Sequence, residues 1–278
     1  NSLDFKVYKK EAINNKSTLN SSFVHSLLKD KNNNIWAGTQ EGLNFYSRDL
    51  DKFNSITFNE ANQNIKFAVH AIEEFNDSTL LVGTHQNGLL KLNKNDYSFK
   101  RVNYKSNNSI SSLLINSIVK TEDEKFIVGT NQGLMTFDPY NSTLQLTKFD
   151  LNDKYETVES SIESILIDNN KTLWLGTSSK GLIKITNTDD SYKIQNLMIT
   201  NKRVLSLSLK QDGNILCGTE NDGLFEISNE KNEIENYKFD KNIQDGIKSN
   251  SIWSTYTDEK NRIWLGYYNN GIDVYNEN

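Results

Sequence analysis

Short runs of alternating apolar and polar residues follow one another along the whole chain. In residues 204–209, VLSLSL, the side chains of Leu205, Leu207 and Leu209 stand at every second position, and the turn KQDGN and a second apolar run, ILCGT, come next. Alternation with a period of two predicts a β-strand that buries one face. No segment has the i, i+3, i+4, i+7 spacing of an amphipathic helix. The pattern therefore predicts an all-β fold.

A single phrase occurs six times: an apolar strand that ends in glycine, a few polar residues, a second glycine and another strand. The first glycines are Gly38, Gly83, Gly129, Gly176, Gly218 and Gly266, so successive copies are 45, 46, 47, 42 and 48 residues apart. The first five copies each read as four strands, A to D, and the sixth reads as strands A to C. In the first copy the strands are SFVHSLLKD, IWAGT, GLNFYS and FNSITF. Four-stranded antiparallel units at this period are typical of a β-propeller. Residues 1–278 are therefore predicted to form one all-β domain, a β-propeller of six four-stranded antiparallel blades.

The two ends of the sequence bear on the sixth blade. The last residues, DVYNEN, read as a strand C, whereas the first ones, LDFKVYKK, alternate in the manner of a strand D. Pairing of the N-terminal segment with the last blade would remove an unpaired sheet edge. We expect the N-terminal strand 4–9 to complete the sixth blade.

Charge and cysteine content narrow the classes of function. The net charge is −5 with both signs interspersed, so no basic stripe can neutralise a nucleic-acid backbone. Cys217 is the only cysteine, so we expect a small buried side chain and no internal disulfide. No stretch approaches the roughly 18 apolar residues of a membrane span, and NSLDFKVYKK does not read as a signal peptide. We expect no nucleic-acid partner and no membrane contact by this chain itself.

Several recurring residues are expected to have structural roles. The first glycine of each phrase, such as Gly38, allows close packing, and the second, such as Gly42, takes a positive φ where the B–C hairpin ends. The aspartates of the A–B hairpins are expected to accept backbone N–H groups as turn formers, and they are Asp30, Asp168, Asp212 and Asp258. Three tryptophans recur just before the first glycine and are expected to pack between blades: Trp36, Trp174 and Trp264.

The blade pattern, (I/L)W(L/A)GT in the blades with tryptophan and Gly-Leu or Gly-Ile after the polar residues in all six, resembles the two-component regulator propeller repeat. The resemblance implies the extracytoplasmic sensor half of a hybrid histidine kinase of Bacteroidetes, on the periplasmic or extracellular face of a Gram-negative bacterium. It also implies a glycan fragment as the signal and a neighbouring sensor or envelope domain as partner. Such sensors usually carry two larger propellers and an immunoglobulin-like domain, whereas this chain has six repeats and no kinase.

In propellers the B–C and D–A loops share one face, so blades that depart from the repeat there are candidates for binding. Five blades have Thr after the first glycine, whereas the sixth has Tyr267 followed by Tyr268. Two exposed aromatic rings beside amides suit a sugar, which has an apolar face and hydroxyl groups. We expect both tyrosines to bind an oligosaccharide or another small ligand; the alternative is that Tyr267 fills space.

Strand A supplies a second row of candidates, one residue before its recurring small residue. The row is His25, His70, Asn116, Glu163, Leu205 and Trp253, and most of these side chains are polar although strand A is the innermost strand. Arg203, in the shortest D–A link, is suited to a bidentate pair with a uronate or sulfate. The predicted ligand-binding set is Tyr267, Tyr268, Arg203, Trp253, His25, His70, Glu41, His85, Gln86, Asn131, Lys180 and Glu220.

Two other functions remain open from the sequence. A protein-protein interaction scaffold in an envelope or secretion complex would expose an extended apolar face without a deep pocket. A propeller lyase would need a titratable pair in the channel, and the available combination is His25 or His70 with Glu41 or Glu163. No H-E-x-x-H spacing or carboxylate motif accompanies the three histidines, so we expect no metal, no cofactor and no catalytic residue.

Overall fold

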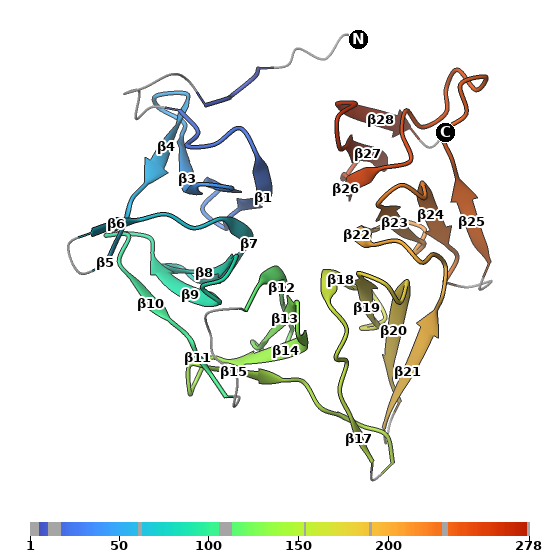
Figure 1. The fold of residues 1–278 in the computed structure, drawn as a ribbon, viewed down its shortest axis with the longest axis horizontal. Helices are drawn as coiled ribbons and strands as arrows, with labels where there is room; N and C mark the ends of the chain where they lie inside the picture. The colour runs from blue at the N-terminus through green and yellow to red at the C-terminus, as the bar shows by residue number, and fades with distance from the viewer. Residues whose placement is uncertain are drawn as a thin grey trace. The chain divides into compact units, whose positions relative to one another are not determined.

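The chain is an all-β, six-bladed β-propeller, as predicted. The structure is a computed structural model that describes residues 6–10, 18–60, 63–105, 113–152, 154–188, 191–229 and 233–276, and no helix occurs among them. Figure 1 shows the sheets in chain order, coloured from blue to red. The chain divides into two compact units, Asn1–Val128 with Thr136–Gln145 and Gly129–Met135 with Leu146–Asn278. Blades 1 and 2 belong to the first unit, blades 4 to 6 belong to the second, and the strands of blade 3 are shared between them.

Each blade is a meander in which strands A, B, C and D pair in that order. Blade 1 is β1 (Val24–Lys29), β2 (Ile35–Thr39), β3 (Gly42–Ser47) and β4 (Lys52–Ile56), and blade 2 is β7 (Val69–Asn76), β8 (Thr79–Thr84), β9 (Leu89–Asn93) and β10 (Phe99–Arg101). Blade 3 is β12 (Ile115–Lys120), β13 (Phe126–Thr130), β14 (Gly133–Asp138) and β15 (Thr143–Leu146). Blade 4 is β18 (Ile162–Ile167), β19 (Leu173–Thr177), β20 (Leu182–Asn187) and β21 (Tyr192–Leu197), and blade 5 is β22 (Val204–Leu209), β23 (Ile215–Thr219), β24 (Leu224–Ile227) and β25 (Ile234–Tyr237). Blade 6 has three strands among the described residues, β26 (Ile252–Thr257), β27 (Arg262–Tyr267) and β28 (Ile272–Asn276).

The D–A links contain short strands that the repeat pattern does not predict. β5 (Phe58–Glu60) and β6 (Gln63–Ile65) form a hairpin after blade 1, and β16 (Phe149–Asp150) and β17 (Tyr155–Glu156) form another after blade 3. β11 (Asn103–Tyr104) pairs in parallel with β15, which adds a fifth strand to the sheet of blade 3. These links therefore lengthen the outer parts of the blades without altering the repeat.

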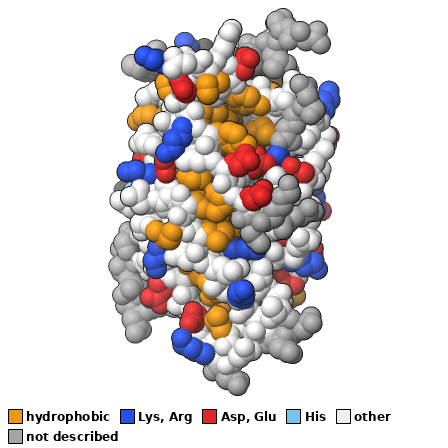
Figure 2. Space-filling model, turned by 90° about the vertical axis from the view of Figure 1, so that its right-hand side faces the viewer, with side chains coloured by type: hydrophobic (Ala, Val, Ile, Leu, Met, Phe, Trp, Pro, Cys, Tyr) orange, Lys and Arg blue, Asp and Glu red, His pale blue; other side chains and the backbone are white. Residues whose placement is uncertain are grey.

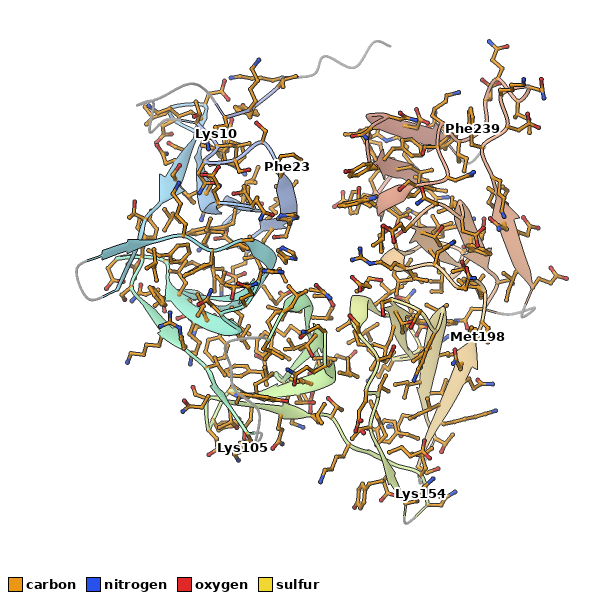
Figure 3. All side chains as sticks on the ribbon, in the orientation of Figure 1. Lys10, Phe23, Lys105, Lys154, Met198 and Phe239 are labelled. Atoms are coloured by element: carbon orange, nitrogen blue, oxygen red, sulfur yellow. The ribbon has the colours of Figure 1, made fainter. Side chains whose placement is uncertain are left out.

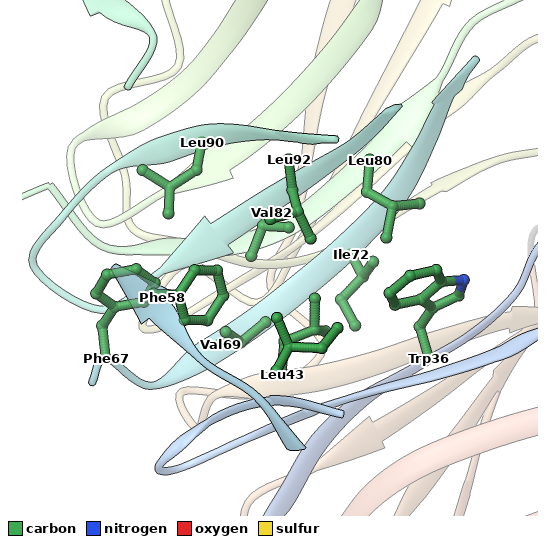
Figure 4. Packing of buried hydrophobic residues seen from close by; sticks show 11 residues of the cluster. Trp36, Leu43, Phe58, Phe67, Val69, Ile72, Leu80, Val82, Leu90 and Leu92 are labelled. Carbon is green, nitrogen blue, oxygen red and sulfur yellow. The ribbon is translucent and has the colours of Figure 1, made fainter. Parts of the chain in front are cut away.

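The cores form where strands A, B and C of successive blades face one another. In the first unit Trp36, Leu43, Val69, Leu80 and Val82 belong to one buried cluster, whose side chains are drawn in Figure 4. A cluster in the second unit contains the buried side chains of Trp174, Val204, Ile215, Cys217 and Phe225. Cys217 is thus a small buried side chain, as predicted. The side chains drawn in Figure 3 fill the space between neighbouring sheets within each unit.

The glycines have the two structural roles predicted from the sequence. The second glycine has a positive φ in every blade, with values of 136° at Gly42, 66° at Gly88, 128° at Gly133, 66° at Gly181, 86° at Gly223 and 73° at Gly271. The first glycine permits close approach, because a Cβ atom added at Gly176 would lie 2.3 Å from Ser164 Oγ and 2.6 Å from the carbonyl oxygen of Val204. Val204 is in the next blade, so this glycine lets β19 pack directly against β22.

The tryptophans and the aspartates of the A–B hairpins act as pairs. In blade 4, Asp168 Oδ1 accepts the backbone N–H groups of Asn170 and Thr172, and Oδ2 accepts the indole N–H of Trp174 at 2.9 Å. The same indole-carboxylate bond occurs between Trp36 and Asp30 and between Trp264 and Asp258, both at 3.0 Å. These aspartates are turn formers, as predicted, and they also hold the tryptophans.

Blade 5 differs at this hairpin. Asp212 lies two positions beyond the place of the other aspartates, where it accepts the Asn214 N–H at 2.9 Å. Lys210 occupies the equivalent place and its ammonium group contacts Glu226 at 2.6 Å. Asp212 is therefore a turn former but not the equivalent of the other three, and blade 5 has no tryptophan to hold.

The N-terminal segment contacts blade 1. The ring of Tyr8 packs edge-on against Phe53 with a centroid distance of 5.3 Å, and its hydroxyl group donates to Asp51 at 2.6 Å. The neighbouring Val7 side chain is 78% exposed, and residues 6–10 form no strand. Residues 4 and 5 lie outside the described residues. Completion of the sixth blade by residues 4–9 therefore stays a prediction.

Candidate functional site

A β-bulge recurs near the start of strand A. In blade 4, Ile162 pairs with Thr177 and Ser164 pairs with Gly176, so that Glu163 is an extra residue on its strand. The same register shift singles out His25, His70, Leu205 and Trp253 in blades 1, 2, 5 and 6. A bulge changes the direction of the side chain that it carries. These five positions, which we call the bulge residues, belong to the strand A row chosen from the sequence, in which Asn116 is the sixth member.

In blades 1, 2, 4, 5 and 6 the first residue of the B–C loop lies next to the bulge. This residue, two positions after the first glycine and called here the loop residue, donates its backbone N–H to the carbonyl group two positions before the bulge residue. The bonds are Gln40 to Phe23, His85 to Ala68 and Ser178 to Ser161, each at 3.0 Å, Glu220 to Arg203 at 2.9 Å and Tyr268 to Ser251 at 3.2 Å. Phe23 is labelled in Figure 3. The B–C loops and D–A links therefore share one end of these blades, as predicted.

In blades 1, 2 and 6 the side chains of the bulge residue and the loop residue contact each other. His25 Nε2 is 2.9 Å from Gln40 Oε1, the rings of His70 and His85 are 5.6 Å apart, and those of Trp253 and Tyr268 are 4.9 Å apart. The two members are always separated by 15 positions in the sequence. The residue predicted from the first loop is Glu41, whereas the residue that contacts His25 is the preceding Gln40. The constant separation is the signal that would have joined the two rows.

In the first unit the pairs bring imidazole rings together. His25 and His70, on neighbouring blades, stack with a centroid distance of 4.3 Å and an angle of 30° between the rings. Glu41 lies in the same loop as Gln40 and binds Lys10 and Lys66. The hydrogen bond from Lys10, followed by that from Lys66, lowers the pKa of Glu41, so this carboxylate is a weak proton acceptor. Within the described residues, no group of three His, Cys, Asp or Glu side chains is arranged to hold a metal ion.

In the second unit an ion cluster lies at the same end of blades 4 and 5. The Nη2 group of Arg203 donates to Glu163 Oε2 at 2.7 Å, and its Nη1 atom is 4.0 Å from Glu220 Oε1. The bulge residue of blade 4 and the loop residue of blade 5 are therefore bridged by one guanidinium group. The cluster joins Arg203 and Glu220 of the predicted ligand-binding set to Glu163 of the strand A row.

Blade 6 carries an exposed aromatic pair. The indole ring of Trp253 and the phenol ring of Tyr268 stack at an angle of 29°, and the two side chains are 44% and 60% exposed. The indole N–H lies 3.3 Å from Ser251 Oγ, which fixes the ring beside the loop. The pair offers a flat apolar surface with polar atoms at its rim.

Tyr267 corrects the expectation of two exposed tyrosines, because its side chain is only 7% exposed. Its hydroxyl group donates to Asp273 at 2.9 Å and accepts the N–H of Lys248 at 3.2 Å. The residue stands where other blades have a threonine that donates to the carbonyl group of the second glycine, as Thr177 does to Gly181 at 2.9 Å. The alternative interpretation, that Tyr267 fills space, is the one the structure supports.

The remaining predicted residues are exposed in the B–C loops without a shared centre. Gln86 has a φ of 73° and follows His85, Asn131 opens the third loop, and Lys180 donates its backbone N–H to Thr177 Oγ1 at 2.8 Å. The structure thus joins members of the predicted set in three groups: His25, His70 and His85; Arg203 and Glu220, bridged to Glu163 of the strand A row; and Trp253 with Tyr268.

A cavity of about 490 Å³ lies elsewhere in the second unit, between blades 5 and 6. Its walls include Leu224 and Tyr237 of blade 5, Leu265 and Tyr275 of blade 6, and Ile243 of the connecting loop. The side of the molecule drawn in Figure 2 shows a band of hydrophobic side chains between acidic and basic ones. Neither Trp253 nor Tyr268 lines the cavity.

The chain is similar to sensor proteins of two-component systems. Residues 18–41 and 246–269 match the family model described as two component regulator propeller, which confirms the resemblance of these repeats. Histidine kinase P4 of Formosa agariphila is 25% identical over 214 residues, which are 72% of this chain and 16% of that protein. No helix among the described residues has the length and apolar character needed to cross a membrane.

Solved structures share the fold. The extracellular domain of a hybrid two component system from B. thetaiotaomicron is 22% identical, with a TM-score of 0.64 over 92% of this chain and 38% of that one. Virginiamycin B lyase from Staphylococcus aureus is 15% identical, with a TM-score of 0.67 over 90% of this chain and 79% of that one. The chain spans well under half of the sensor proteins that it matches, and most of the lyase.

Proposed function

We propose that this chain is the non-enzymatic, ligand-binding propeller of an extracytoplasmic sensor in a two-component system. The matches to the two component regulator propeller model and to a histidine kinase support this role. So does the common fold with an extracellular domain of a hybrid system. The proposed location is the periplasmic or extracellular face of a Gram-negative bacterium, with a neighbouring sensor or envelope domain as partner.

The proposed ligand is an oligosaccharide, bound at the end of the blades that carries the bulge and loop residues. The observation that carries this proposal is the stacked, half-exposed pair of Trp253 and Tyr268. Aromatic rings with one polar end suit the apolar face of a sugar ring, while nearby side chains bond its hydroxyl groups.

Signalling would follow from a difference in affinity between two states of the sensor. A ligand shifts an equilibrium only by the amount by which it binds one state more tightly than the other. A glycan that bridges the loops of neighbouring blades would favour one arrangement of those loops. The neighbouring domain would then contact a different surface.

A thermal-shift screen of the purified chain against oligosaccharides, followed by calorimetry, tests the proposal. A ligand at about 100 times its dissociation constant should add about 2.7 kcal/mol to the free energy of unfolding. That should raise the melting temperature by several degrees, at about 2–4 °C per kcal/mol. Trp253→Ala and Tyr268→Ala should abolish the shift while remaining folded.

The matched control is Tyr140→Ala, since Tyr140 is 94% exposed and lies in a C–D turn. This variant should keep the ligand-induced shift. Binding that survives both aromatic substitutions would contradict the proposed site.

A further inference from the structure

The charges beside the aromatic pair bear on which sugars the site accepts. We infer, on the premise of the proposed function, that the site binds neutral oligosaccharides and disfavours uronates and sulfated sugars. The sequence alone suggests the opposite, because an arginine at this end suits an acidic sugar. The difference lies in what the structure places around Arg203.

The guanidinium group of Arg203 already faces two carboxylates. It donates to Glu163 at 2.7 Å and lies 4.0 Å from Glu220. The side chain of Glu163 is only 9% exposed. A uronate that took over the guanidinium group would leave this carboxylate buried without its partner, which is costly.

The cluster also carries an excess of negative charge, since one guanidinium group faces two carboxylates. A carboxylate or sulfate on the ligand would be repelled by that excess. Hydroxyl groups would instead find acceptors, because an ionised carboxylate accepts several hydrogen bonds. Glu220 is the accessible one of the two, with its side chain 37% exposed.

The ion cluster and the aromatic pair lie on one continuous part of the second unit. Gly223, at the end of the loop that begins with Glu220, donates its N–H to Asn250 O at 2.9 Å. The next residue, Ser251, accepts the N–H of Tyr268 at 3.2 Å. The loops of blades 5 and 6 are therefore tied to two adjacent residues. We expect a single oligosaccharide that stacks on Trp253 to reach Glu220.

Blade 5, which lies between the blades of Glu163 and Trp253, adds an uncharged residue to the proposed site. Its bulge residue is Leu205, an apolar side chain in a row where the neighbours are an acid and an indole. Lys180 and Lys202 are exposed at the same end of blades 4 and 5. They are the cations through which an acidic sugar could still be held, so Lys180 belongs in the test.

The experiment uses neutral hexose tetrasaccharides and their C6-oxidised uronate counterparts of identical linkage, measured by calorimetry with the full chain. Where a neutral tetrasaccharide binds, we expect its affinity to be at least about tenfold higher than that of its uronate counterpart. This ratio corresponds to a difference in binding free energy of about 1.4 kcal/mol. Glu220→Gln keeps an acceptor oxygen but removes one charge. We expect this variant to bind the uronate several-fold more tightly than the wild-type chain does, because one repelling charge is gone. Its affinity for the neutral sugar should stay within about twofold of the wild-type value, so the ratio of the two affinities becomes smaller. Lys180→Ala should leave the preference unchanged.

The outcomes separate this inference from the proposed function. Equal or tighter binding of the uronate, lost in Trp253→Ala, would overturn the neutral preference and leave the glycan site standing. Uronate binding that disappears in Lys180→Ala would overturn it as well. If neither sugar of any pair binds the folded chain, the proposed glycan site fails and the preference fails with it.

Discussion

Single carboxylates show how the surroundings of one side chain set its charge. Burial by itself would raise the pKa of Asp30, but hydrogen bonds from Trp36, Asn34 and Lys94 outweigh it and lower the pKa to about 2. Glu73 shows the opposite balance, because burial dominates and raises its pKa to about 7. The sequence does not distinguish the two acids. The difference depends on donors that reach Asp30 from its own hairpin and from the next blade.

Glu73→Gln should change stability in a pH-dependent way. The folded-state pKa of about 7 exceeds the ordinary value of 4.5, so folded wild-type protein binds more protons between these values and loses stability as pH rises through that window. We expect the substitution to raise the free energy of unfolding by about 1–3 kcal/mol at pH 8 and by much less at pH 4.5. Urea unfolding at both pH values measures this.

The exposed Glu259 provides the control for Glu73. Glu259→Gln should have a small effect at either pH. An equal effect of Glu73→Gln at pH 4.5 and pH 8 would contradict the prediction.

Strands were predictable as elements, whereas their bulges were not. The alternation in VLSLSL assigns Leu205, Leu207 and Leu209 to one face, but the bulge removes Leu205 from it. Val204 joins Leu207 and Leu209 in the hydrophobic cluster instead. The alternation of residues along one strand does not reveal a β-bulge, because the bulge is a shift in the pairing with the neighbouring strand. Both rows of the candidate site were predicted from the sequence. Their pairing was missed although the constant separation of 15 positions marks it, and the burial of Tyr267 was only the alternative interpretation.

Gly176→Ala tests the close approach of neighbouring blades. The new Cβ would meet Ser164 Oγ at 2.3 Å and the backbone oxygen of Val204 at 2.6 Å, and backbone cannot easily move aside. We expect a loss of about 3 kcal/mol, as in other overpacked cores. The free energy of unfolding in urea measures it.

Gly213→Ala is the comparison, because a Cβ there meets nothing within 4 Å and only the positive φ of 85° opposes it. The cost should be about 1 kcal/mol. A milder effect at Gly176 than at Gly213 would show that the blades can separate at this point.

For the whole molecule, the period of the repeat predicted the number of blades. It did not predict the additional short strands in the D–A links. The hairpin of β5 and β6 and the parallel strand β11 lie in segments without a regular alternation. The sixth blade shows three strands in the described part of the chain. Each repeat packs mainly on its neighbours, so the terminal blades gain most from an added strand.

Completion of the sixth blade by residues 4–9 can be tested at Val7. A strand that pairs with the last blade would bury this side chain, which is 78% exposed beside blade 1. We expect Val7→Asp to lower the melting temperature by several degrees, as deletion of residues 1–10 should. Tyr8→Ala should lower it in either case because Tyr8 packs on Phe53. An unchanged melting temperature for Val7→Asp would mean that residues 4–9 do not complete the blade.

The recurrent bulge has a consequence for how such a propeller can diversify. The residues on either side of it are held by the core and by the first glycine, as Ile162 and Ser164 are in blade 4. The bulge residue and its loop partner escape that constraint. Substitutions can therefore accumulate at two positions per blade, from imidazole to carboxylate to indole, while the fold stays the same. Exchanging these pairs between blades is a direct route to receptors with new specificities.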